Sequence, residues 1–249
     1  MEDNIFNKIK ITSIASIIEV LGGHPIDRWK VNSQMRSKDR LTFKTLLLSG
    51  RKNLYAGLRT ALYYNSIFYF PAIYALDHVW KADNIGKTIF VSFMITPIVS
   101  CFEGIKTDQQ VNKLHDKDML YIMKKRYSEY GVRGLMPSFY STFYREFCYC
   151  SGLLLLSPFI ASKINTGKDY IDRFVGGGLA GLVSQSMSQP FDSIKTRQEK
   201  YKTGFIETIK IINKEGKTNY WNGGLGRCIR GVWSISCMSV MCNSLSKII

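Results

Sequence analysis

The sequence predicts an all-α membrane protein, with six transmembrane helices in three pseudo-symmetric repeats and short surface helices between them. Three observations predict this fold class. Long apolar stretches end in one short charged pattern, the pattern occurs three times at a spacing close to a third of the chain, and a glycine-aromatic turn follows each copy. A threefold repeat decides the architecture, because each repeat forms one structural unit. We therefore expect a single domain over 1–249, with repeats over about 8–82, 85–166 and 170–249.

The repeated pattern is a break in an apolar stretch, followed by a carboxylate two residues later and a lysine three residues after that. The copies begin at Pro25, Cys101 and Pro190. Their carboxylates and lysines are Asp27 and Lys30, Glu103 and Lys106, and Asp192 and Lys195. The position nine residues after each start holds Gln34, Gln110 and Glu199. A single copy could arise by chance, whereas three copies that each close a long apolar stretch indicate a repeat.

The first unit begins with a transmembrane helix over about 10–34. We expect a kink at Pro25, because a proline inside a helix removes one backbone hydrogen bond. A surface helix over about 41–48 and a second transmembrane helix over about 55–79 complete this unit.

The second and third units repeat this order. Their transmembrane helices are expected over about 87–110, 137–163, 171–198 and 224–247, and their surface helices over about 117–127 and 205–213. Gly177 and Gly181 stand four residues apart, and small residues at this spacing let two membrane helices approach closely. Equivalent places in the first and third transmembrane helices hold Thr12, Ser16, Thr88 and Ser92.

The formal net charge of +15 has two explanations. A nucleic-acid-binding protein is one, but the lysines and arginines lie mostly between apolar stretches and do not form a single stripe. A membrane protein beside anionic headgroups, or with a cavity for anionic solutes, fits this distribution better. The mean hydropathy of -0.07 is low for a membrane protein. Helices that line a water-filled path explain it, because only their lipid-facing side must be apolar.

No arrangement in the sequence is typical of an enzyme, a cofactor site or a metal site. His24, His78 and His115 are scattered, and the six cysteines include no CxxC pair. The first ten residues are mixed and polar, unlike a secretory signal. We therefore expect a monomer that is not an enzyme and has no cofactor, metal or nucleic-acid partner. Its expected partners are a small anionic solute and anionic membrane lipids such as cardiolipin.

Three tandem units with these charged breaks resemble the mitochondrial carrier family of solute transporters, over about 11–247. The resemblance implies a multi-pass protein of the mitochondrial inner membrane, with a central cavity that opens alternately to the two sides. Compact carriers of this kind include ones encoded by giant viruses. For such a member the membrane would be that of the host mitochondrion.

The resemblance also implies a gate on the matrix side, because in the family the acid of one repeat pairs with the base of the next. The implied pairs are Asp27 with Lys106, Glu103 with Lys195, and Asp192 with Lys30. Gln34 and Gln110 stand where the family braces these pairs. A lone charge inside a membrane is costly and is therefore expected to pair. The alternative, that these residues only cap kinked helix ends, leaves their threefold repetition unexplained.

A second gate, toward the cytoplasm, has weak support. Family members carry an aromatic-acid-x-x-base pattern near the ends of the even-numbered helices. The second transmembrane helix has Asp77, with Lys81 one residue late, and the fourth has Leu154 in place of the acid. The sixth has Asn243 in place of the acid, and Lys247 is again one residue late. Closure on this side then rests on packing, or the protein leaks or favours one state.

The substrate contacts of the family are expected seven positions after the glycine of each turn. Counting from Gly57, Gly134 and Gly223 reaches Tyr64, Ser141 and Arg230, with Asn65, Thr142 and Gly231 beside them. Arg145 lies one turn beyond Ser141 on the same helix face and precedes Glu146. Because arginine stays charged and binds phosphate or carboxylate through two parallel hydrogen bonds, an anionic substrate is favoured. Alternatively, Arg145 pairs locally with Glu146 or extends along the lipid.

The pair Arg230-Gly231 resembles a contact of adenine nucleotide carriers, and Tyr64 or Phe68 could stack on a base. This favours exchange of nucleotides or deoxynucleotides such as ATP, ADP or dATP. Arg145-Glu146 resembles the arginine-acid pair of amino-acid carriers, but it is four residues out of register in the count from Gly134. Two alternatives therefore stay open, an amino-acid or carboxylate carrier and a degenerate carrier that acts as a membrane scaffold.

Overall fold

The structure is a computed structural model, and it describes residues 5–34, 55, 57–79, 84–111, 118–136, 138–164 and 166–246. Within these ranges every regular element is a helix, which confirms the predicted all-α class. The expected surface helix over 41–48 lies outside the described residues.

Six long helical segments run through the described part of the chain, as the sequence predicts. The first, third and fifth are single helices: α1 (Ile5–Ser33), α6 (Asn84–Val111) and α10 (Asp169–Tyr201). The second consists of α4 (Leu58–Tyr63), η2 (Tyr64–Tyr69) and α5 (Phe70–Val79). The fourth consists of α8 (Phe139–Cys150), η3 (Ser151–Leu156) and α9 (Ser157–Lys163), and the sixth is α12 (Gly224–Leu245). Both η2 and η3 are π-helical, a feature that the sequence did not predict.

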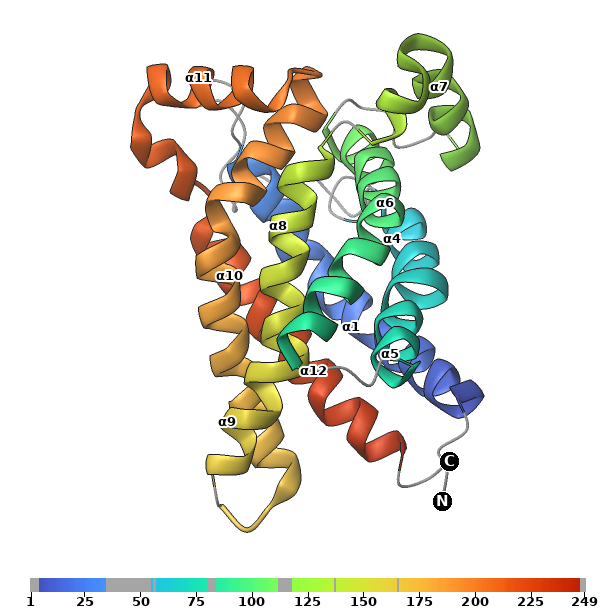
Figure 1. Ribbon diagram of the computed structural model, residues 1–249, viewed down its shortest axis with the longest axis vertical. Coiled ribbons are helices and arrows are strands. Elements are labelled where there is room, and N and C mark those ends of the chain that lie inside the picture. The colour runs from blue at the N-terminus through green and yellow to red at the C-terminus, as the bar shows by residue number, and fades with distance from the viewer. Residues whose placement is uncertain are drawn as a thin grey trace.

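The six segments form a closed ring. Contacts join each segment to the next along the chain, and α12 returns to pack against α1. The surface helices α7 (Met119–Leu135) and α11 (Phe205–Glu215) lie together at one end of the ring (Figure 1). The start of α1 and the end of α12 lie toward the opposite end. A short 3-10 helix, η4 (Lys217–Trp221), leads from α11 toward α12.

The helices are polar on the inside and apolar on the outside, the reverse of a water-soluble protein. In α1 the inward positions hold Thr12, Ser16 and Glu19, all buried. Its exposed positions hold Ile14, Ile17, Ile18 and Leu21. The inner face of α6 holds Thr88, Ser92, Thr96 and Ser100, and its exposed face holds Ile89, Phe93, Met94 and Ile98. Such a surface suits lipid, while the polar interior suits a hydrated path.

The same distribution explains why hydropathy alone finds few membrane spans. Of the described helices, the segment Ile85–Gln110 is the one long and apolar enough to cross a membrane by length and composition. The other long segments carry more polar or charged residues on their inner faces, such as Gln185 and Gln189 of α10. An average over the whole helix therefore underestimates how apolar the outer face is.

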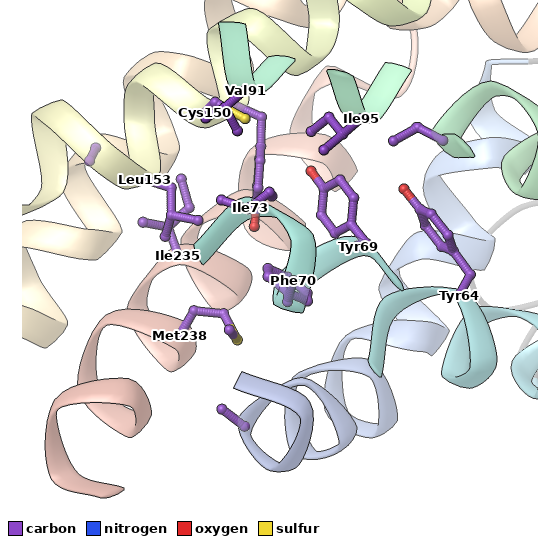
Figure 2. Close-up of a cluster of buried hydrophobic side chains, with 14 residues drawn as sticks. Tyr64, Tyr69, Phe70, Ile73, Val91, Ile95, Cys150, Leu153, Ile235 and Met238 are labelled. Atoms are coloured by element: carbon purple, nitrogen blue, oxygen red, sulfur yellow. The ribbon is translucent and has the colours of Figure 1, made fainter. Parts of the chain in front are cut away.

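A cluster of buried hydrophobic side chains from the long segments lies inside the ring. Figure 2 shows Phe70 and Ile73 of the second segment beside Ile235 and Met238 of α12. Tyr64 and Tyr69, both from η2, lie at one edge of this cluster with their ring centroids 5.3 Å apart. Because hydrogen bonds in a π-helix reach five residues along the chain, η2 brings these two tyrosines to the same face.

Glycines bring α10 and α12 into close contact. A Cβ atom on Gly181 would lie 2.5 Å from the backbone oxygen of Gly231, and one on Gly177 would lie 2.9 Å from Cα of Ser236. The predicted close approach at Gly177 and Gly181 is thus confirmed. The equivalent small residues of α1 and α6 are also buried: Thr12, Ser16, Thr88 and Ser92.

We expect Gly181→Ala to destabilise the fold, because its new methyl group meets backbone atoms of α12 that cannot move aside alone. Overpacking of this kind costs about 1–3 kcal/mol. The expected fall in the unfolding midpoint is about 2–10 °C, measured in detergent with a thiol-reactive dye. Gly178→Ala is the matched control, because its methyl would meet the movable Oγ of Ser236 at 3.2 Å. Equal midpoints for both variants would contradict the close packing.

Candidate functional site

Three carboxylates and three lysines link the first, third and fifth long segments, α1, α6 and α10, across the ring. Lys106 donates to Asp27, Lys195 pairs with Glu103, and Nζ of Lys30 lies 3.2 Å from Oδ2 of Asp192. Each contact joins a carboxylate to a lysine of another repeat, and the three pairs are those expected from the resemblance. All six side chains have low exposure, at most 18 % for Glu103. We call this set the charged ring.

The residues expected to brace the charged ring behave differently from one another. The side-chain amide of Gln34 donates to Asp192 at 2.5 Å, and its oxygen accepts from Thr196 at 2.8 Å. Glu199, in the equivalent place of the third repeat, lies 3.4 Å from Nζ of Lys195. The buried side-chain amide of Gln110 makes no hydrogen bond with any described residue. Gln110 therefore braces no pair in this structure, contrary to expectation.

Two arginines from the fourth and sixth long segments contact carboxylates of the charged ring. Both terminal nitrogens of Arg145, on α8, contact the carboxylate of Glu103, at 2.9 and 2.6 Å. Arg145 also donates a hydrogen bond to Glu146. Arg227 of α12 lies 2.5 Å from Oδ1 of Asp192. Sequence reasoning missed Arg227, although it stands three residues before Arg230 and so lies on the same helix face.

A third arginine pairs with a carboxylate that sequence reasoning also missed. Arg230 of α12 donates to Oε1 of Glu19, which lies in the middle of α1 and is fully buried. The indole of Trp233 donates to the backbone oxygen of Glu19 at 2.9 Å. Gly23 leaves room for this arrangement, because a Cβ atom there would lie 2.7 Å from Cζ of Arg230. The signal in the sequence that could have identified Glu19 is that it is a single acid within the apolar stretch before Pro25.

The N-terminal caps of α4, α8 and α12 correct the positions from which the expected substrate contacts are counted. The residues that cap α4, α8 and α12 are Gly57, Ser138 and Gly223. Gly134 lies inside α7, so it is not the residue that caps α8. Gly57 and Gly223 have φ of 77° and 78°, whereas Ser138 caps α8 with φ of -122°. Seven positions after the three caps stand Tyr64, Arg145 and Arg230, and Glu146 falls beside the second.

These three residues line one cavity of about 90 Å³ inside the ring. Of the predicted substrate contacts, the cavity is lined by Tyr64, Asn65, Arg145, Glu146, Arg230 and Gly231. It is not lined by Ser141, Thr142 or Phe68. Ser141 donates to Gln198 of α10 at 2.7 Å, and Thr142 bonds to Ser138 at 3.2 Å. Phe68 lies on the outer surface, 43 % exposed, because the π-helical η2 turns Tyr69 inward in its place.

The cavity presents both signs of charge. Its cationic side chains are Lys30, Lys106, Arg145, Arg227 and Arg230, and its carboxylates are Asp27, Glu103 and Glu146. Two positive charges are therefore in excess among the described lining residues. The hydroxyl of Tyr69 fixes Glu146 by donating to it at 2.6 Å. The site can thus bind a carboxylate through an arginine and a cationic group through a glutamate.

The opposite end of the ring contains no second charged ring among the described residues. Asp77 pairs with Lys87 at 2.9 Å, and Asn243 donates to Asp169 at 2.7 Å. Leu154 packs against the hydrophobic cluster. Lys81 and Lys247, the two bases expected here, lie outside the described residues.

Further ion pairs fix the surface helices to the end of the ring where α7 and α11 lie. Arg126 of α7 donates to Asp108 of α6 at 2.6 Å, and Arg197 of α10 donates to Glu215 of α11 at 2.6 Å. Lys202, just beyond α10, lies 3.2 Å from the same Asp108. Burial lowers the pKa of Lys202, and the nearby Arg126 lowers it further, while Asp108 opposes the change.

Comparison with known proteins finds similarity to mitochondrial transporters. The family model described as mitochondrial carrier protein matches residues 167–249. Mitochondrial citrate transporter A of Aspergillus niger is 25% identical over 255 residues, covering 89% of this chain and 84% of that protein. The carnitine/acylcarnitine carrier protein of Mus musculus is 26% identical over 247 residues, covering 82% and 81%. The mitochondrial glycine transporter of Xenopus tropicalis is 28% identical over 182 residues, covering 65% and 59%.

We expect Lys195→Met to destabilise the protein far more than Lys87→Met. Lys195 is 5% exposed, and removing one partner of a buried pair costs roughly 3–5 kcal/mol. Lys87 is 20% exposed in a pair of the same type, and such a pair contributes about 0–1 kcal/mol. Unfolding midpoints in detergent should therefore fall on the order of 10 °C for the first variant and only slightly for the second. A small effect for both would show that the charged ring contributes little to this state.

Proposed function

Because the chain belongs to the mitochondrial carrier family, we propose that it transports a small amino acid across the mitochondrial inner membrane. Members of this family are multi-pass transporters of that membrane and not enzymes. The amino-acid specificity is supported chiefly by the corrected register, which brings Arg145-Glu146 to the level of Arg230. In that register the pair resembles the arginine-acid pair of amino-acid carriers.

The charges of the cavity match the two charged groups of an amino acid. Its carboxylate would bind the guanidinium of Arg230 through two parallel hydrogen bonds. Its ammonium group would face Glu146, whose orientation is fixed by Tyr69. A volume of about 90 Å³ suits a small solute such as glycine better than a large one.

Binding at this level would disturb the charged ring. Arg145 holds both Glu103 and Glu146, and Glu103 also pairs with Lys195. A substrate that draws Arg145 toward the cavity therefore weakens one link of the ring. In the proposed cycle this opens the path toward the end that carries α7 and α11, and the path closes again when the substrate has left and the ring re-forms.

A nucleotide has less support as the substrate than the sequence suggested. Phe68, one of the two candidates for stacking on a base, lies on the outer surface. Tyr64, the other, is stacked on Phe102 with ring centroids 5.6 Å apart. The relatives described above are named for citrate, carnitine and glycine.

A small di- or tricarboxylate is the second candidate. The excess of two positive charges in the cavity favours it, since an amino acid carries no net charge. The similarity to a citrate transporter over 89% of this chain points in the same direction.

Uptake of labelled glycine, citrate and ATP into liposomes that contain the purified protein tests the proposal. We expect glycine uptake, and we expect internal unlabelled glycine to accelerate it if transport is exchange. Citrate uptake without glycine uptake would favour the second candidate, and ATP uptake alone would restore the nucleotide hypothesis. Folded protein that takes up none of the three would favour a membrane scaffold.

We expect Arg230→Ala and Arg145→Ala each to reduce glycine uptake at least about tenfold, because a hydrogen bond to a charged group contributes about 1.5–3 kcal/mol. Arg230→Lys should retain part of the uptake, since it keeps the charge but not the paired hydrogen bonds. Arg173→Ala is the control, because Arg173 pairs with Asp169 at a partly exposed position outside the cavity. Wild-type uptake by a correctly folded Arg230→Ala protein would remove Arg230 from the site.

A further inference from the structure

Glu19 is a fully buried carboxylate whose charge depends on one cation. Its Oε1 accepts a hydrogen bond from Arg230, and its side chain has 0% exposure. Its Oε2 has no hydrogen-bond partner among the described residues. Unlike the surface acids, this group cannot compensate for a lost partner by turning toward water.

The other described groups around Glu19 do not supply a second positive charge. Tyr149 of α8 and Cys237 of α12 lie close enough to interact with it electrostatically. The hydroxyl of Tyr149 makes a hydrogen bond of 2.9 Å with the hydroxyl of Ser234. On the same helix as Glu19, Asp27 acts on Arg230 as a second negative charge. Within the described residues, Arg230 is thus the cation that balances Glu19.

The remaining carboxylates at this level each keep a partner when one is lost. Asp27 faces both Lys106 and Lys30, and Glu103 faces both Arg145 and Lys195. Asp192 faces Lys30 and Arg227, with Gln34 as a further donor. Glu146 has Arg145 and the hydroxyl of Tyr69. Glu19 differs from all four, because no second donor among the described residues reaches its side chain.

We propose that Glu19 takes up one proton each time a substrate carboxylate replaces it on Arg230, so that a proton crosses the membrane together with the substrate. This inference rests on the proposed function, which brings a carboxylate to Arg230. A buried carboxylate without a partner is far less stable when charged than when neutral. The exchange of partners on Arg230 therefore favours protonation of Glu19.

The proton balance of the cycle is simple. On the side where substrate enters, a proton from water binds to a carboxylate oxygen of Glu19, while Arg230 exchanges Glu19 for the substrate. On the other side, the substrate leaves Arg230, Glu19 releases its proton to water, and the pair of Glu19 with Arg230 re-forms. No bond within the substrate changes, and one positive charge moves with each zwitterionic amino acid.

Glycine uptake into liposomes under an imposed pH gradient tests this coupling. The membrane potential is held at zero with valinomycin and equal potassium on both sides, so that the pH gradient acts alone. For one proton per substrate, an outside pH lower by about one unit should raise glycine accumulation up to about tenfold. Without the gradient, accumulation should not exceed the external concentration.

Three variants assign the coupling to Glu19. Glu19→Gln keeps the size and hydrogen-bonding capacity of the side chain, and its glycine uptake should no longer respond to the gradient. Glu19→Asp keeps a titratable carboxylate and should retain the response. Glu129→Gln makes the same chemical change at a partly exposed position beside Lys125 and should behave as wild type.

The outcomes distinguish the coupling from the proposed function. Wild-type glycine uptake that ignores the gradient would overturn the coupling and leave amino-acid transport standing. A gradient response retained by Glu19→Gln would overturn the role of Glu19. Folded wild-type protein that takes up neither glycine nor citrate at any gradient would overturn the proposed function and the coupling with it.

Discussion

The charged ring is the constraint on which the rest of this structure depends. Asp27, Glu103 and Asp192 have low exposure among the helices, so each must face a cation or remain neutral. Their lysines come from other repeats, and the ring therefore holds α1, α6 and α10 together. Because desolvation offsets most of the attraction in a buried pair, the ring fixes an arrangement of helices more than it adds net stability.

Charge balance explains why further charged residues gather at the same level. Arg145 and Arg227 add positive charge beside Glu103 and Asp192, and Glu146 returns one negative charge beside Arg145. Hydroxyl and amide groups occupy many of the other buried positions, while the outer faces stay apolar. The low mean hydropathy of the chain is a direct consequence, since it averages two opposite faces.

The sequence predicted those features that depend on local spacing. The triplicated breaks indicated the six long segments, and the resemblance to a known family implied the pairing of Asp27, Glu103 and Asp192 with lysines of other repeats. The features it missed depend on contacts between distant residues or on local irregularity. Glu19 and Arg230 are 211 residues apart, so no spacing rule connects them. The count for α8 began at Gly134, whereas the residue that caps α8 is Ser138, and a search for glycine does not detect a serine at this position. Phe68 was misplaced because a π-helical stretch shifts the inward face, which a pattern of 3.6 residues per turn cannot predict.

In the proposed cycle the arginines of the cavity already hold carboxylates of the protein itself, and this limits how tightly a substrate can bind. A substrate carboxylate at Arg230 would exchange one ion pair for another, so the net gain is the difference between two similar interactions. A ligand shifts a conformational equilibrium only by its difference in affinity for the two states. A transporter must also release its substrate, which strong net binding would prevent. Replacing a carboxylate of the protein by the carboxylate of the substrate satisfies both requirements. It rearranges the ion pairs near the charged ring while the total free energy changes little.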